Sequence, residues 1–306
     1  MHRNNIHKNG YDFEALSQHY PDLKPFLTIS TKGKTSIDFA NSKAVKALNS
    51  ALLSRYYAIH FWDIPDGYLC PAVPGRADYI HHIAELLAKN QTLGSPKRKI
   101  VGLDIGTGAN LVYPIIGSQA YKWHFIASDI EQVSFSSAKT IIEANSHLKK
   151  RIKLRLQTDK QCFFKNILKE REYVDFTMCN PPFHSSRQAA LSGNQRKLRG
   201  LKHNQRKRSS KKAVFSSHNT TSELNFGGQN NELWCDGGEL RFITNMIKES
   251  VEVGSQVGIF TCLVSKSANL KPLLKLLQHI DAREIRQIDM YQGNKISRFI
   301  TWTFKE

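Results

Sequence analysis

Apolar, strand-like stretches alternate with helix-like stretches along much of this chain, and this alternation constrains the fold more than any other feature. Strand-like runs lie at residues 99–104, 123–128, 151–156, 174–179 and 257–264, and helix-like stretches begin near Asn110, Gln132, Gly238 and Leu270. Two further strands near residues 284–290 and 297–304 are joined by Gln292-Gly293-Asn294, which indicates a hairpin. Alternating strands and helices pack as a parallel sheet covered by helices. We therefore predict an α/β fold with seven strands, mostly parallel, and a C-terminal antiparallel hairpin.

The first ninety-odd residues have a different pattern, which is mainly helical. Helices are predicted at residues 13–20, at 41–57 with Asn41 as the N-cap, and at 76–89. The stretch Gly94-Ser95-Pro96-Lys97-Arg98 is typical of a linker. We expect a helical N-terminal extension over residues 1–95 and a second domain over residues 96–306.

A glycine turn follows the first strand of that second domain. Gly106 and Gly108 lie between Asp104 and Asn110, where a strand passes into a helix. Leu111 stands where a dinucleotide fingerprint needs its third glycine, so NAD is disfavoured. Asp129 ends the next strand, about 20 residues further on, where a carboxylate can accept from both hydroxyls of a ribose. The pattern predicts a pocket for an adenosine-containing cofactor.

The segment Asn180-Pro181-Pro182-Phe183 follows the strand at residues 174–179 and carries the clearest chemical signal. Two prolines fix φ and remove two amide donors, so the backbone turns here with its carbonyls free to accept. An Asn side-chain carbonyl, a backbone carbonyl and an aromatic ring would then meet at one point. That combination suits a flat group that carries an NH2.

A strongly basic segment follows this turn. The formal net charge of the chain is +18, and no Asp or Glu occurs from Phe176 to Thr221. Such an excess favours a polyanionic partner, although a run of like charges is also typical of a solvated or disordered face or of a localisation signal. The stretch from residue 184 to residue 236 is much longer than the usual connection between two elements of a compact domain, so we expect it to be a substrate loop. Its predicted RNA-binding residues are Arg196, Lys197, Arg199, Lys202, Arg206, Lys207, Arg208, Lys211 and Lys212.

Several protein classes are disfavoured by composition. No apolar run approaches about 20 residues, and the first residues lack the apolar core of a signal peptide, so we expect a soluble, cytoplasmic protein without a membrane partner. The five cysteines are scattered and contain no Cys-x-x-Cys pair, which predicts neither a disulfide framework nor a metal site. Each cysteine is expected to be a packing residue, including Cys179 next to the turn.

The motifs together resemble one family, the large-subunit (23S) ribosomal RNA adenine-N6 methyltransferases known as RlmF, and their eukaryotic adenosine-N6 methyltransferase relatives. Besides Asn180-Pro181-Pro182-Phe183-His184, the resemblance rests on residues 61–65, 74–80, 225–229, 232–239 and 263–266, and it covers nearly the whole chain. It implies a Rossmann-like class I methyltransferase with S-adenosylmethionine as the donor and N6 of an adenosine as the target. The segment 195–221 is longer and more basic than the family usually carries there.

The resemblance also assigns residues. Asn180 and Pro181 would orient the target amine within the turn that Pro182 completes, and Phe183 would stack on the base. The donor pocket would comprise Asp104, Gly106, Gly108, Asn110, Asp129, Gln157 at the adenine edge, Asn180, and Arg76 on the methionine carboxylate. Lys266 would contact the RNA backbone, His184 would lie at the pocket rim, and Trp234 is undecided between core anchor and base stacker.

We therefore expect an enzyme that acts on naked or partly assembled ribosomal RNA, as a monomer and without a metal. Three alternatives stay open at this point: adenine in another RNA or in DNA as the target, a protein glutamine amide as the target, and a non-catalytic RNA-binding assembly factor. The basic segment argues against a protein substrate, and the intact turns argue against a non-enzyme.

Overall fold

The computed structural model describes residues 1–30, 33–90, 98–186, 188, 230–293 and 295–304 of the 306. Its centre is a seven-stranded sheet made of β3 (Val101–Ile105), β4 (His124–Asp129), β5 (Ile152–Leu156), β6 (Val174–Cys179), β7 (Val257–Leu263), β8 (Arg283–Gln292) and β9 (Lys295–Thr303). The strand order is β5-β4-β3-β6-β7-β9-β8. Strand β9 runs antiparallel to β7 and to β8, whereas the pairs from β5 to β7 are parallel. This arrangement confirms the predicted α/β fold with its C-terminal hairpin.

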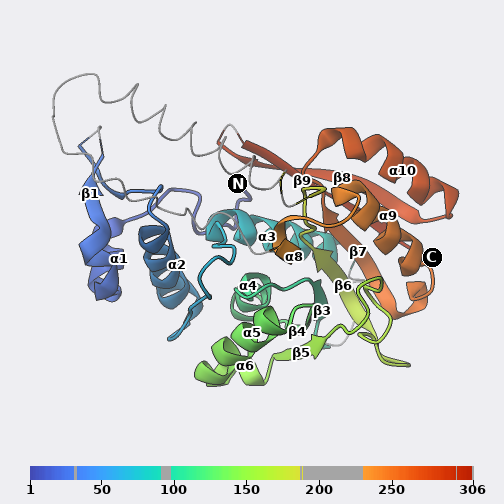
Figure 1. The fold of residues 1–306 in the computed structure, drawn as a ribbon, viewed down its shortest axis with the longest axis horizontal. Coiled ribbons are helices and arrows are strands. Elements are labelled where there is room, and N and C mark those ends of the chain that lie inside the picture. Colours follow the sequence, from blue (N-terminus) through green and yellow to red (C-terminus); the bar gives the residue numbers. More distant parts are fainter. Residues whose placement is uncertain (31–32, 91–97, 187, 189–229, 294, 305–306) are drawn as a thin grey trace.

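Each face of the sheet is covered by its own hydrophobic core, because successive residues of a strand point to opposite faces. On β4 and β6, Phe125 and Phe176 belong to one core, which also holds residues of α2 (Ser42–Tyr57), α3 (Val73–Asn90), α4 (Val112–Ala120) and α5 (Gln132–Ala144). The other core takes Ile126 and Cys179 from the same strands and also holds residues of α9 (Gly238–Ser250) and α10 (Leu270–His279). Figure 1 shows α1 and α2 at one end of the molecule and α9 and α10 at the other.

Strand order reverses between β3 and β6, and this reversal fixes the place of a ligand site. From β3 the chain continues outward through β4 to β5, while β6 lies on the opposite side of β3. In open α/β sheets, ligands bind at the carboxyl ends of the strands beside such a switch point. The glycine turn after β3 and the Asn180 turn after β6 both lie there.

The helix α3 begins three residues earlier than the sequence predicted, at Val73 instead of Arg76. Pro74 is tolerated because the first helical turn has no partners for its amide groups. Gly75 and Arg76 both donate their backbone N–H to the carbonyl of Ala72. Arg76 therefore sits in the first turn of a rigid helix that packs beside α4 and β8.

The N-terminal residues form α1 (Phe13–His19), a 3-10 turn over Pro21–Phe26, α2, and a two-stranded sheet of β1 (Leu27–Ile29) and β2 (Thr35–Ile37) that the sequence did not predict. Asn41 caps α2 as predicted, because its side chain accepts from the backbone N–H of Lys43 and Ala44. Among the contacts that join this part to the residues around the large sheet, the Trp62 indole donates to the carbonyl of Asn110 at 2.8 Å, and the side-chain amide of Asn145 donates to the carbonyl of Phe61 at 2.7 Å.

Shorter elements complete the described residues. They are α6 (Ser146–Lys149), α8 (Asn230–Leu233) and the 3-10 turns Gly254–Gln256 and Ser267–Asn269. The expected linker at residues 94–98 lies outside the described residues except for Arg98. Within the described part of the chain, no helix combines the length and apolar composition needed to cross a membrane.

Candidate active site

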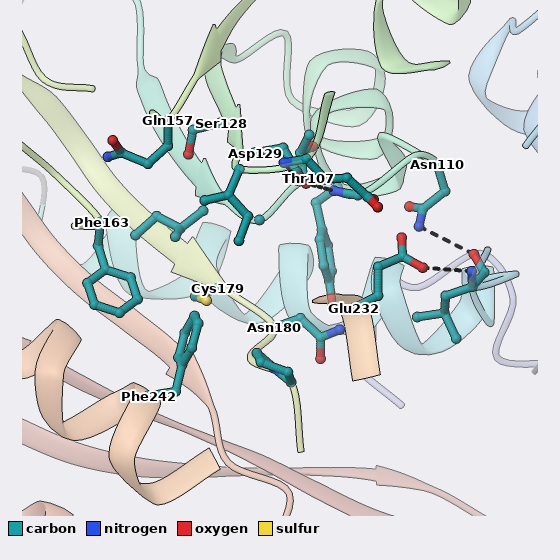
Figure 2. Close-up of a pocket in the computed structure, with 18 of the residues that line it drawn as sticks. Thr107, Asn110, Ser128, Asp129, Gln157, Phe163, Cys179, Asn180, Glu232 and Phe242 are labelled. Atoms are coloured by element: carbon teal, nitrogen blue, oxygen red, sulfur yellow. Dashed lines mark hydrogen bonds between the residues drawn. The ribbon is translucent and has the colours of Figure 1, made fainter. Parts of the chain in front are cut away.

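A pocket opens at the carboxyl ends of β3, β4 and β6, at the switch point of the sheet (Figure 2). Eight of the predicted site residues line it: Arg76, Gly106, Gly108, Asn110, Asp129, Gln157, Asn180 and Pro182. These residues come from positions more than 100 apart in the sequence, and the fold brings them to one cavity. Asp104, Pro181 and Phe183 are not among the lining residues.

The glycine turn has the backbone geometry that glycine allows. Gly106 and Gly108 adopt φ values of +69° and +65°, in the left-handed region that side chains disfavour. A side chain on Gly108 would also approach an oxygen of Glu232 to 2.8 Å. Leu111 has a φ of 52° just before α4, so the chain turns into the helix without a third glycine. The turn leaves its backbone close to the pocket.

Asp129 is held at the end of β4 by two backbone donors. Gly108 donates its N–H to Oδ2 at 2.8 Å, and Glu131 donates to Oδ1 at 2.9 Å. Burial raises the pKa of Asp129 above its ordinary value, and these backbone hydrogen bonds oppose the rise. The carboxylate is therefore fixed at the pocket wall with lone pairs that can still accept from a ligand.

Asp104 lies deeper, on β3 below the glycine turn. It is 1 % exposed, and neither carboxylate oxygen has a hydrogen-bond partner within the described residues. Burial raises its pKa to about 7; the nearby Thr107 hydroxyl opposes the rise, the charge of Asp129 adds to it, and Arg76 opposes it. A carboxyl buried with little more than the nearby Thr107 hydroxyl to compensate it is costly, which makes Asp104 a candidate for a role in the site.

Arg76 reaches the pocket from the first turn of α3. Its guanidinium donates to the Tyr113 hydroxyl at 2.6 Å and stacks over the same ring, 5.4 Å from its centroid. No ion pair involving Arg76 is found among the described residues. Tyr113 thus orients the guanidinium group, and the remaining N–H donors of Arg76 can bind a carboxylate.

Gln157 is buried at the loop after β5, and protein groups occupy both ends of its side-chain amide. Its amide nitrogen donates to the carbonyl of Lys165 at 2.8 Å, and its oxygen accepts from the N–H of Asp159 at 3.0 Å. Its backbone N–H donates to the carbonyl of Asp129. In the structure, Gln157 therefore shapes the loop that lines the pocket.

The turn after β6 places its residues at different depths. Pro181 and Pro182 are buried, while Asn180 and Phe183 are half-buried, and the Phe183 ring lies 4.4 Å from that of His184. His184 donates its N–H to the carbonyl of Leu233, and its carbonyl accepts from the N–H of Cys235. These two bonds join the start and the end of the long segment 184–236 next to the pocket. Trp234 lies at this junction and is half-buried, and its indole nitrogen has no hydrogen-bond partner among the described residues.

The residues predicted to bind RNA fall into two groups. The basic residues from Arg196 to Lys212 lie outside the described residues. Lys266 is described: it is exposed after β7, and its backbone N–H donates to the carboxylate of Glu239. Glu239 is 1 % exposed and also accepts from the N–H of Ser265 at 2.6 Å and the amide of Asn269 at 2.7 Å. It thus fixes the loop that carries Lys266.

Sequence reasoning missed four residues that shape this site: Tyr113, Phe163, Phe242 and Glu232. Phe163 and Phe242 form an edge-to-face pair, 4.8 Å between ring centroids, along one wall in Figure 2. Glu232 belongs to the stretch 232–239, which was singled out as a motif without a role. Nothing in the local sequence places these side chains at a pocket formed by distant strands.

Comparisons with known proteins agree with this geometry. A family model described as "RNA methyltransferase" matches residues 1–306. The chain is 50 % identical to the ribosomal RNA large subunit methyltransferase F of Pseudoalteromonas atlantica, covering 100 % of this chain and 92 % of the relative. It is 48 % identical to the protein of that name from Desulfotalea psychrophila, with 100 % and 95 % covered.

Solved structures of human METTL16 are similar over the whole chain. The catalytic domain in complex with the MAT2A 3′UTR hairpin 6 has a TM-score of 0.77 at 29 % identity, covering 100 % of this chain and 98 % of that one. The N-terminal domain in complex with SAH has a TM-score of 0.76 at 26 % identity, with 100 % and 99 % covered.

Proposed function

The chain belongs to the RNA methyltransferase family, and from this premise we propose that it transfers a methyl group from S-adenosylmethionine to N6 of one adenosine in large-subunit (23S) ribosomal RNA. The observation that carries the proposal is that Asn180, the glycine turn and Asp129 line the same pocket. One wall suits an adenosine-containing donor and the other suits a planar amine. The basic segment behind the turn favours a polyanion as the substrate.

The residues present fit the donor. Asp129 offers a carboxylate for ribose hydroxyls, and the turn at Gly106 and Gly108 gives close backbone approach. Arg76, which donates to Tyr113 and has no ion pair among the described residues, offers its remaining donors to the methionine carboxylate. We assign donor binding to Arg76, Asp104, Gly106, Gly108, Asn110, Asp129, Gln157 and Asn180. When bound, the donor supplies an electrophilic methyl group on a sulfonium.

The chain's own chemistry is positioning. The lone pair of an exocyclic amine is conjugated into the base, so the amine is a poor nucleophile. Acceptance of its two hydrogens by the Asn180 side chain and the Pro181 carbonyl would draw the nitrogen toward tetrahedral geometry and release the lone pair. Phe183 would hold the base by stacking, and the adenosine must leave its stack to enter. No strong base is required, which leaves His184 as a rim residue.

The decisive experiment compares ribosomal RNA from cells with and without this protein. We expect one N6-methyladenosine of large-subunit RNA to be absent when the protein is absent. Assays with radiolabelled donor on RNA, DNA and ribosomal protein fractions then distinguish an RNA target from a DNA adenine or a protein glutamine amide. Label in the DNA or protein fraction alone contradicts the proposal.

Replacing Arg76 by alanine is expected to weaken S-adenosylhomocysteine binding by about 10- to 100-fold, because a charge-assisted bidentate pair is lost. Calorimetric titration measures this change. The control ligand is 5′-methylthioadenosine, which lacks the carboxylate and should bind the variant and the native protein equally. Equal losses for both ligands would show that Arg76 acts only through the fold.

The basic segment is expected to supply sequence-independent attraction to RNA. Deleting residues 196–212 should weaken RNA binding and flatten its dependence on salt, because fewer counterions are released, while donor affinity stays the same. A variant of native length with glutamine at the basic positions controls for the shortened chain. If RNA affinity depends on salt concentration equally in the native protein and in the deletion variant, the segment does not contribute to RNA binding.

We propose a cytoplasmic monomer that needs no metal and acts on naked or partly assembled RNA, with residues 1–95 as an N-terminal extension of the catalytic domain 96–306. Lys266 would contact the RNA backbone from the loop that Glu239 fixes.

A further inference from the structure

Glu232 is a carboxylate in the pocket that the proposed chemistry has not yet used. It lies on the short helix α8, directly after the undescribed residues 189–229. Figure 2 shows its carboxylate beside Asn110, on the side of the pocket where Asn180 lies. The residue thus occupies the end of the cavity away from Gln157.

Within the described residues, the hydrogen bonds of Glu232 are all with backbone groups. Oε2 accepts from the N–H of Leu69 at 2.8 Å, and Oε1 accepts from the N–H of Ala109 at 3.4 Å. No lysine, arginine or histidine pairs with it among the described residues. Each oxygen therefore has a lone pair left for a further donor.

The surroundings of this carboxylate favour a cation. Burial raises the pKa of Glu232 to about 7, and the nearby carboxylates of Asp129 and Glu131 add to the rise. Several acidic groups around one cavity repel each other, so a bound positive charge would offset that repulsion. A phosphate or a second carboxylate would increase it.

The donor brings such a charge. Its methionine moiety is a zwitterion, and the site proposed above gives its carboxylate a partner in Arg76 but gives its α-ammonium none. We propose that Glu232 accepts the α-ammonium of the donor's methionine moiety, so that Arg76 and Glu232 together recognise the zwitterion. This inference rests on the proposed use of S-adenosylmethionine and adds a recognition residue to that site.

Asp104 is a further carboxylate near this pocket that has no ion pair among the described residues, and it competes for this role. It is 1 % exposed beneath the glycine turn and is not among the residues lining the cavity, whereas Glu232 is. A ligand in the cavity would reach Glu232 directly. We therefore assign the direct contact to Glu232.

The test is a cycle between protein variants and donor analogues, followed by calorimetric titration. The ligands are S-adenosylhomocysteine, its analogue without the α-amino group, and 5′-methylthioadenosine. The native protein should bind S-adenosylhomocysteine about 10- to 100-fold more tightly than the deamino analogue. In Glu232→Gln this ratio should fall close to one, with 5′-methylthioadenosine bound as in the native protein.

The matched control is Glu131→Gln, which removes the same charge from the same pocket. Glu131 accepts from the Ser134 hydroxyl at 2.8 Å, and we expect this variant to keep the native ratio. The proposal is overturned if the Glu232→Gln protein keeps the native preference for S-adenosylhomocysteine over the deamino analogue. It is also overturned if the Asp104→Asn protein loses this preference while the Glu232→Gln protein keeps it. Equal binding of S-adenosylhomocysteine and the deamino analogue by the native protein also overturns the proposal, and this result needs no variant. If the native protein binds neither S-adenosylhomocysteine nor the deamino analogue, the result instead contradicts the proposed use of S-adenosylmethionine as the donor.

Discussion

Replacing Asn180 with alanine is expected to lower N6-methyladenosine formation on large-subunit ribosomal RNA by about 100- to 1,000-fold, the range seen when one preorganised hydrogen-bonding group is removed from a catalytic site. The loss should appear mainly in the rate at saturating donor and RNA, because the acceptor matters most as the amine nitrogen changes geometry. Single-turnover assays with radiolabelled donor measure it directly.

The control for this variant is Asn180→Asp. It keeps a side-chain oxygen in the same place and should retain more activity than the alanine variant. Because Asn180 also lines the donor pocket, donor affinity is measured for both variants by titration. An alanine variant that binds donor normally and methylates at the native rate would contradict the proposed mechanism.

Replacing Asp104 with asparagine is expected to stabilise the donor-free protein and to impair the site. The folded state raises the pKa of Asp104 from 3.8 to about 7, chiefly by burial. Between these two values the folded state holds a proton that the unfolded state releases, so the free energy of unfolding falls as pH rises through this window and stays low above it. One pKa unit corresponds to about 1.4 kcal/mol, so the cost approaches roughly 4 kcal/mol above pH 7.

The asparagine variant cannot ionise and avoids this cost. Its gain in the free energy of unfolding should be absent near pH 4, should grow up to pH 7, and should then remain constant, as measured by urea unfolding at a series of pH values. Asp66→Asn, at an exposed position, is the control and should show no such profile. If Asp104 supports the donor as proposed, donor affinity should fall in the same variant that gains stability. A gain that does not depend on pH would contradict the ionisation argument.

The sequence predicted most of the sheet because buried strands carry a strong local pattern. The strand that leads to Asn180 was predicted over residues 174–179 and is observed as Val174–Cys179. The N-cap at Asn41 was also predicted, since capping is decided by one side chain and its next few neighbours. The β1–β2 pair was not predicted, because strands of three residues are too short to show an alternation.

The site was predictable only where a motif carries its own chemistry. The glycine turn, Asp129 and Asn180 were found from strand ends, and the structure brings them into one cavity. Glu232 was not found, since its contact with Ala109 joins residues 123 positions apart. The side chain of Gln157 was expected to face the adenine, but its contacts with Lys165 and Asp159 depend on how the following loop folds.

The junction between His184 and Cys235 has a consequence for how such proteins can diverge. Its two backbone hydrogen bonds return the chain to one place, so the residues between them begin and end at the same anchored point. Basic residues can therefore be gained or lost between these two anchors without any change to the backbone hydrogen bonds that hold them. Evolution can adjust how strongly the enzyme holds its polyanion without altering the turn at Asn180 that selects the amine.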